Sequence, residues 1–172
     1  MSRQPTIGRR TLMMAAPAML AASGAAAQAP PAVETPKLEL AFTIYVQIGP
    51  TQEIGAVPAG VARVIPITGG VLEGKVRGRV IPGGADWQIS RPDGVTELRA
   101  HYGLETTDGA VIQVNNHCLI TPHNGARLIR SRISMEAPTG PHDWLNKYVF
   151  LGTLNAPGDA RAPVVIRGFQ TV

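Results

Sequence analysis

The sequence predicts an all-β protein, a single antiparallel β-barrel of about eight or nine strands with little helix. Short runs rich in Val, Ile and Thr alternate with dense turn signals along the 172-residue chain, which is typical of antiparallel strands joined by tight turns. Several runs also alternate polar and apolar residues, so each strand has one wet and one dry face. A closed barrel is favoured because a flat sheet of so many strands would leave its edges unpaired.

Glycine, proline and asparagine mark the predicted turns. These are Gly69-Gly70, Pro82-Gly83-Gly84, Pro92-Asp93-Gly94, Asp108-Gly109, Asn124-Gly125 and Pro157-Gly158-Asp159. The strands predicted between them cover residues 38–48, 60–68, 71–81, 85–90, 95–106, 110–121, 126–136, 147–153 and 163–171. A turn from Asp143 to Lys147 is the one helical candidate.

The alternation is clearest in residues 95–106. It places Glu97, Arg99, His101 and Glu105 on one face and Leu98, Ala100, Tyr102 and Leu104 on the other. The same split recurs in residues 75–81 and 126–135. Each of these strands is therefore expected to turn its charged face to water and its apolar face to the barrel interior.

Residues 1–27 are predicted to be an export signal. A polar start with the adjacent Arg9 and Arg10 precedes an apolar run and small residues, which is the layout of a bacterial secretory signal. The arginine pair resembles the twin-arginine signal. Cleavage is expected after Ala27, with Ala29 as the alternative. Because the apolar run is short for a membrane span, we expect a periplasmic or otherwise exported protein without a stable membrane anchor.

The remaining chain is predicted to comprise a Pro-rich linker, residues 28–37, and the barrel domain, residues 38–172. Three of the 16 Lys and Arg residues lie in the signal, which leaves 13 against 12 Asp and Glu. With a net charge near zero and no basic stripe, nucleic acid is not an expected partner. The single cysteine also excludes an internal disulfide.

Three segments resemble the family catalogued as domain of unknown function 3237, also called uncharacterised protein family 0311. They are the long segment containing GKVRGRVIPGGADWQISRPDG, the segment TTDGAVIQVNN and the segment WLNKYVFLGTL. The resemblance covers roughly residues 38–172. It implies a calycin-like or allene-oxide-cyclase-like barrel that forms homo-oligomers. Where this family usually reads Leu-Asp-Ala-Arg-Tyr, the chain has Leu98-Arg99-Ala100-His101-Tyr102, which would alter ligand specificity if that strand faces the ligand.

Asp86 and His101 are the candidate catalytic residues. Asp86 follows the Gly83-Gly84 pair at a strand start and could serve as an acid or base, or it could stabilise the turn. His101 has an imidazole whose ordinary pKa of ~6.5 suits proton transfer at neutral pH. The alternative for His101 is a solvated outer face of alternating charges.

Five further side chains are candidate substrate contacts: Trp87, Tyr102, Asn116, Trp144 and Asn146. These residues could instead have structural roles. For example, either tryptophan could simply fill or seal the core. Tyr102 and His101 point to opposite faces of a regular strand, so a bulge would be needed for both to line one cavity.

No cofactor and no metal site are expected. The four histidines lack a compact metal-binding spacing. The adjacent His117 and Cys118 do not form a nucleophile and base pair, because neighbours on a strand point to opposite faces. Cys118 is expected to be a small buried hydrophobe.

Three functions stay open, and whether the protein is an enzyme is not decided. The leading hypothesis is a barrel that binds a small, partly apolar carbonyl or aromatic compound. The first alternative is a cofactor-independent lyase, isomerase or cyclase that uses Asp86 and His101 as acid and base. The second is a non-catalytic oligomeric interaction protein. If Asp86 and His101 converge on a closed pocket, the enzyme is favoured; if His101 faces water, that enzyme loses its best base.

Overall fold

A computed structural model gives the fold and describes residues 34–156 and 162–172. The predicted export signal, residues 1–27, lies outside the described residues, as does most of the predicted linker. Residues Thr35–Val172 form one structural unit. Within the described ranges, no helix is long and apolar enough to cross a membrane.

The described residues of this unit form nine strands and one short 3-10 helix. The elements are β1 (Leu38–Ile48), β2 (Gln52–Val57), β3 (Gly60–Gly74), β4 (Gly78–Ser90), β5 (Thr96–Thr106), β6 (Val111–His123), β7 (Ala126–Glu136), η1 (Asp143–Asn146), β8 (Phe150–Asn155) and β9 (Val164–Thr171). The predicted helical turn corresponds to η1.

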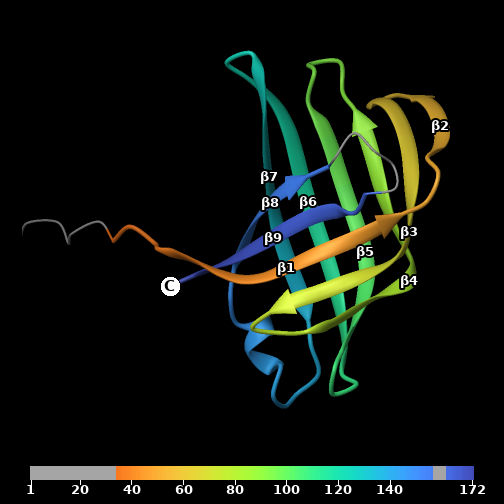
Figure 1. Cartoon of the computed structure of the whole chain (residues 1–172). Helices are drawn as coiled ribbons and strands as arrows, with labels where there is room; N and C mark the ends of the chain where they lie inside the picture. Colours follow the sequence, from red (N-terminus) through yellow and green to blue (C-terminus); the bar gives the residue numbers. More distant parts are fainter. Residues whose placement is uncertain (1–33, 157–161) are drawn as a thin grey trace, which may run out of the picture. The chain divides into compact units, whose positions relative to one another are not determined.

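The strands form a closed antiparallel barrel, which confirms the predicted fold class. Their order is β1-β9-β8-β7-β6-β5-β4-β3-β2, and an additional pairing joins β1 to β3. This pairing closes a barrel of eight strands and leaves β2 as an extra strand on the first part of β3. Figure 1 shows β1 and β9 crossing the front of the barrel, with β5 and β6 behind them.

Two predicted turns are wrong, because the glycines concerned lie inside long strands. Gly69-Gly70 falls within β3 and Gly83-Gly84 within β4, each at a shift in the pairing register. Gly70 has φ 145°, and a Cβ there would lie 2.1 Å from the carbonyl oxygen of Tyr45 on β1. The glycines therefore let β3 bend and bring its second half against β1, which is how the barrel closes.

The predicted inward and outward faces match the observed burial. Along β5, Leu98, Tyr102 and Leu104 are buried, whereas Arg99 and His101 are exposed. The largest fully buried side chains come from strands all around the barrel: Phe42, Ile44, Leu104, Ile112, Ile133 and Phe150. The apolar faces thus meet in one interior core, and a polar group on an inward face is an exception to this pattern.

Candidate functional site

Three neighbouring strands bring two polar side chains to either side of an alanine in the barrel interior. Asp86 on β4 is the cross-strand partner of Ala100 on β5, and Ala100 is the partner of Asn116 on β6. Residues directly opposite each other on antiparallel strands share a face of the sheet. Because Ala100 has a small side chain, the space between Asp86 and Asn116 is not filled.

A cavity of about 30 Å³ lies at this point. Its polar lining comes from Asp86, Tyr102 and Asn116, and Cys118 also reaches it. The remaining walls are apolar side chains: Val46, Ile48, Ile67, Leu98, Ala100, Leu154, Val164 and Ile166. A cavity of this size exceeds the roughly 10–15 Å³ that one water needs, but it admits only a small group.

The polar atoms that line the cavity are unpaired. Among the described residues, no hydrogen-bond partner is found for Asp86 Oδ1, the Tyr102 hydroxyl or Asn116 Oδ1, and all three are buried. Buried polar atoms are nearly always hydrogen-bonded, because leaving one unsatisfied costs roughly 1–3 kcal/mol. Three such atoms around one cavity are therefore a mark of a binding site.

A hydrogen-bonded chain fixes the orientation of the Asp86 carboxyl group. Arg63 Nε donates to Gln88 Oε1 at 2.9 Å, and Gln88 Nε2 donates to Asp86 Oδ2 at 2.6 Å. Because a guanidinium can only donate, the oxygen of Gln88 must face Arg63 and its amide nitrogen must face Asp86. Oδ2 is therefore an acceptor, and in the neutral acid the proton lies on Oδ1, the oxygen at the cavity.

Burial favours the neutral forms of the ionisable groups at this site. Burial raises the pKa of Asp86, against the opposing effects of the Gln88 hydrogen bond, the Arg63 charge and a backbone hydrogen bond from Arg99. Burial also raises the pKa of Tyr102, and the nearby Asp86 charge raises it further. The same two causes raise the pKa of the Cys118 thiol to about 11, so this thiol stays protonated at neutral pH.

The structure does not bring His101 to Asp86. His101 is exposed on the outer face of β5, whereas Asp86 faces the interior, and no bulge within β5 and β6 reverses that alternation. The predicted acid and base pair is therefore not assembled. Arg99 is also exposed, so both Arg99 and His101 lie on the outer wall.

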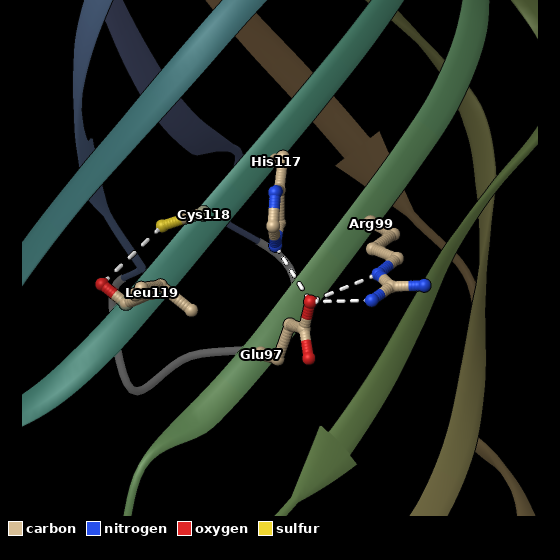
Figure 2. Close-up of polar contacts among 5 residues, drawn as sticks. All are labelled: Glu97, Arg99, His117, Cys118 and Leu119. Carbon is tan, nitrogen blue, oxygen red and sulfur yellow. Dashed lines mark hydrogen bonds and ion pairs between the residues drawn. The ribbon is translucent and has the colours of Figure 1, made fainter.

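A separate polar cluster occupies that outer wall. Figure 2 shows Arg99 of β5 and His117 of β6 pointing to the same carboxylate oxygen of Glu97. The distances are 2.7 Å from Arg99 Nη2 and 2.7 Å from His117 Nε2 to Glu97 Oε1. These hydrogen bonds, that of Arg99 above all, lower the pKa of Glu97. Cys118 lies at the cavity instead, so His117 and Cys118 do not act together, as predicted.

Of the five candidate substrate contacts, Tyr102 and Asn116 line the cavity and the tryptophans and Asn146 do not. Trp87 is 54% exposed on the outer wall, so it neither fills the core nor meets the cavity. Trp144 packs edge-on against Phe150, with ring centroids 6.0 Å apart.

Both the oxygen and the nitrogen of the Asn146 side-chain amide form hydrogen bonds with the backbone of Ala137. Its Oδ1 accepts from the Ala137 N–H at 2.8 Å, and its Nδ2 donates to the Ala137 carbonyl at 3.0 Å. These two bonds tie η1 to the end of β7, and the neighbouring Leu145 is buried in the core. The WLN segment therefore closes the end of the barrel that does not hold the cavity.

Sequence reasoning missed three members of this site. Cys118 was expected only to fill space, and neither Arg63 nor Gln88 was singled out. The alternation indicates that Asp86 and Gln88 share a face, but only the register between β3 and β4 places Arg63 opposite Gln88. No group of three or more His, Cys, Asp and Glu side chains suited to a metal ion occurs in the part of the chain that the structure describes.

Residues 36–171 match the protein family described as "Protein of unknown function (DUF3237)". The chain belongs to the DUF3237 family. A UPF0311 protein of Rhodopseudomonas palustris is 38% identical over 136 residues, a match that covers 69% of this chain and 89% of that protein. The family resemblance seen in the sequence is thereby confirmed.

Solved structures share the DUF3237 barrel. A conserved protein of unknown function from Rhodopseudomonas palustris has a TM-score of 0.73 and 33% identity, covering 81% of this chain and 100% of that chain. A beta-barrel like protein from Acinetobacter baumannii has a TM-score of 0.74 and 27% identity, covering 83% of this chain and 100% of that chain.

One relative of this DUF3237 chain is named for a reaction. A hydroalkoxylation enzyme of Penicillium herquei is 26% identical over 118 residues, which cover 69% of this chain and 74% of that protein. A crystal structure of an enzyme from the same organism has a TM-score of 0.66 and 25% identity, covering 82% of this chain and 98% of that chain.

The raised pKa of Asp86 predicts that Asp86→Asn changes stability in a pH-dependent way. A carboxyl group with a raised pKa in the folded state destabilises the fold as pH rises from about 4 through that folded pKa. Asp86→Asn removes this effect, so the variant should gain stability relative to the parent over that interval and keep the gain at higher pH. Urea unfolding of both proteins between about pH 3 and 8 measures this difference.

Asp108→Asn is the matched control, because the pKa of Asp108 is shifted in the opposite direction to that of Asp86. Hydrogen bonds from Thr106 and then from His142 lower the pKa of Asp108, so its contribution to stability is present above about pH 4 and is lost as pH falls through the folded pKa. Asp108→Asn should therefore be less stable than the parent at neutral pH and equal to it in acid. A pH-independent difference for Asp86→Asn would contradict the assignment.

Proposed function

We propose that the interior cavity takes up the polar group of a small, mostly apolar compound and that Asp86 exchanges a proton with this compound. The protein would then be a cofactor-independent enzyme of the lyase, isomerase or cyclase type. The observation that carries this proposal is the buried carboxyl group with one oxygen held by Gln88 and the other unpaired at the cavity. A carboxyl group whose pKa is raised by burial is suited to giving and taking protons near neutral pH.

Asp86 acts as both the acid and the base in this proposal, because His101 lies on the outer wall. Asp86 Oδ1 gives its proton to an unsaturated carbon of the substrate, and the resulting carboxylate recovers a proton from a second position of the substrate or of a group that adds to it. The charged intermediate is stabilised by Gln88, whose N–H donates to Oδ2, and by the Arg63 charge behind it.

The named reaction of the Penicillium relative supports an enzymatic role. Hydroalkoxylation adds an O–H bond across a carbon–carbon double bond, and such an addition needs a proton donor at carbon and an acceptor for the hydroxyl proton. A carboxyl group that alternates between its two protonation states provides both. The similarity of 26% supports the class of chemistry and does not identify the substrate.

Deuterium incorporation tests this proton transfer. Small unsaturated alcohols and enones are incubated with the protein in D2O, and formation of carbon–deuterium bonds is followed by NMR. Asp86→Asn should lower the rate of incorporation at least ~100-fold, which is the lower range of general acid–base catalysis. His101→Gln is the control and should keep the parent rate.

Equal rates for the parent and Asp86→Asn would contradict the role of Asp86. If the compounds bind in the cavity and none incorporates deuterium, the non-catalytic binding function would be favoured instead. A rate lost in His101→Gln as well as in Asp86→Asn would mean that the outer wall takes part in the reaction.

We also propose that residues 1–27 direct export and that the barrel works in the periplasm as a homo-oligomer. The Arg9 and Arg10 pair before an apolar run supports export, and the family resemblance is the basis for expecting a homo-oligomer. Native mass spectrometry of protein isolated from the periplasm tests both parts. A mature chain beginning at Gln28 and a mass that is a multiple of that chain are expected, and an uncleaved monomer would contradict them.

A further inference from the structure

We propose that Asp86, Tyr102 and Asn116 together bind one hydroxyl group, so that the ligand of this barrel is a small apolar alcohol or phenol. This inference rests on the proposed function, since it names the class of compound that the cavity takes. It follows from which atoms are left unpaired and from what each of them can donate or accept.

The three unpaired atoms differ in hydrogen-bonding character. When Asp86 is neutral, its Oδ1 carries the proton and donates, because Oδ2 is held by the Gln88 N–H. The Tyr102 hydroxyl donates or accepts, and Asn116 Oδ1 only accepts. The site therefore offers two donors and one acceptor around a cavity of about 30 Å³.

One hydroxyl group can form hydrogen bonds with all three of these unpaired atoms. It accepts two hydrogen bonds through its lone pairs and donates one through its proton. With the Asn116 amide oriented as in this structure, a carbonyl oxygen accepts from Asp86 and Tyr102 but brings no donor to Asn116 Oδ1. An ionised carboxylate is disfavoured, because it can only accept hydrogen bonds and would bury a negative charge against the acceptor Asn116 Oδ1.

The position of the site supports an apolar body for this hydroxyl compound. The small cavity accommodates the hydroxyl group, and half-buried apolar side chains surround it towards one end of the barrel. These are Ile48, Leu154 and Val164. A hydrocarbon or ring attached to the hydroxyl gains free energy from contact with these side chains, in proportion to the apolar area removed from water.

Calorimetric titration with inert probes tests the inference. Phenol should bind at least ~10-fold more tightly than toluene, which has the same ring without the hydroxyl, since one well-made buried hydrogen bond is worth about that factor. Cyclohexanol should likewise bind more tightly than cyclohexanone. Tyr102→Phe and Asn116→Leu should each reduce the preference for phenol, and the exposed Tyr148→Phe should leave it unchanged.

The parent protein alone decides the main question, so a variant that fails to fold leaves the test intact. The inference is wrong if phenol does not bind at millimolar concentrations, if it binds no more tightly than toluene, or if cyclohexanone binds at least as tightly as cyclohexanol. The last result would mean that the site takes a carbonyl group.

Asp86→Asn separates this inference from the proposed proton transfer. Gln88 Nε2 requires an acceptor, so the amide oxygen of the substituted side chain should occupy the Oδ2 position and its N–H group should face the cavity. The variant should therefore keep the preference for phenol within ~3-fold while it loses deuterium incorporation. Loss of both properties would contradict the hydroxyl site, and retention of both would contradict the proton transfer alone.

Discussion

The pairing of β1 with β3 is the constraint on which the barrel depends. Without it, β1 and the second half of β3 would each leave a free edge, and the inward faces of the strands would not be enclosed. The pairing requires β3 to approach the β1 backbone closely at Gly70 and Gly74, where a Cβ would lie 2.1 Å and 2.5 Å from carbonyl oxygens of β1. Glycine at these positions is therefore a condition of closure.

Closure fixes the register of the strands, and the register determines the site. Asp86, Ala100 and Asn116 share one row across β4, β5 and β6, and Tyr102 lies two residues further along β5. Gly84 leaves room for that tyrosine, since a Cβ there would lie 2.4 Å from Tyr102 Cβ. The cavity thus results from small residues at particular points of a barrel that is otherwise filled by large side chains.

The site lowers the stability of the fold, which is informative about its role. One oxygen of a carboxyl group and two further polar atoms are buried without partners among the described residues, although apolar side chains of similar size would stabilise the core. Such unfavourable burial commonly occurs at functional sites, where groups are arranged for a ligand and not for the free protein.

Much of this arrangement could be predicted from the sequence, and there is a physical reason why the rest could not. The period-two alternation correctly predicted that Tyr102 faces inward and that His101 points to the opposite face. Alternation carries no information on which residues of different strands are neighbours, because loop lengths and bulges set that register. The Gly69-Gly70 pair matches a common turn signal, although it lies at a bend within β3. The hydrogen-bonded chain from Arg63 through Gln88 to Asp86 could not be predicted, because it depends on the register between β3 and β4.

The central claim is that burial at the cavity raises the pKa of the Asp86 carboxyl group, and that the proton of the neutral acid lies on Oδ1. A carbon-13 NMR titration of the aspartate carboxyl carbons tests it most directly, with the Asp86 signal assigned by its absence in Asp86→Asn. We expect the Asp86 midpoint to lie clearly above the ordinary value of about 3.9 and the midpoint of Asp108 to lie below it. An Asp86 midpoint at or below the ordinary value would contradict the account.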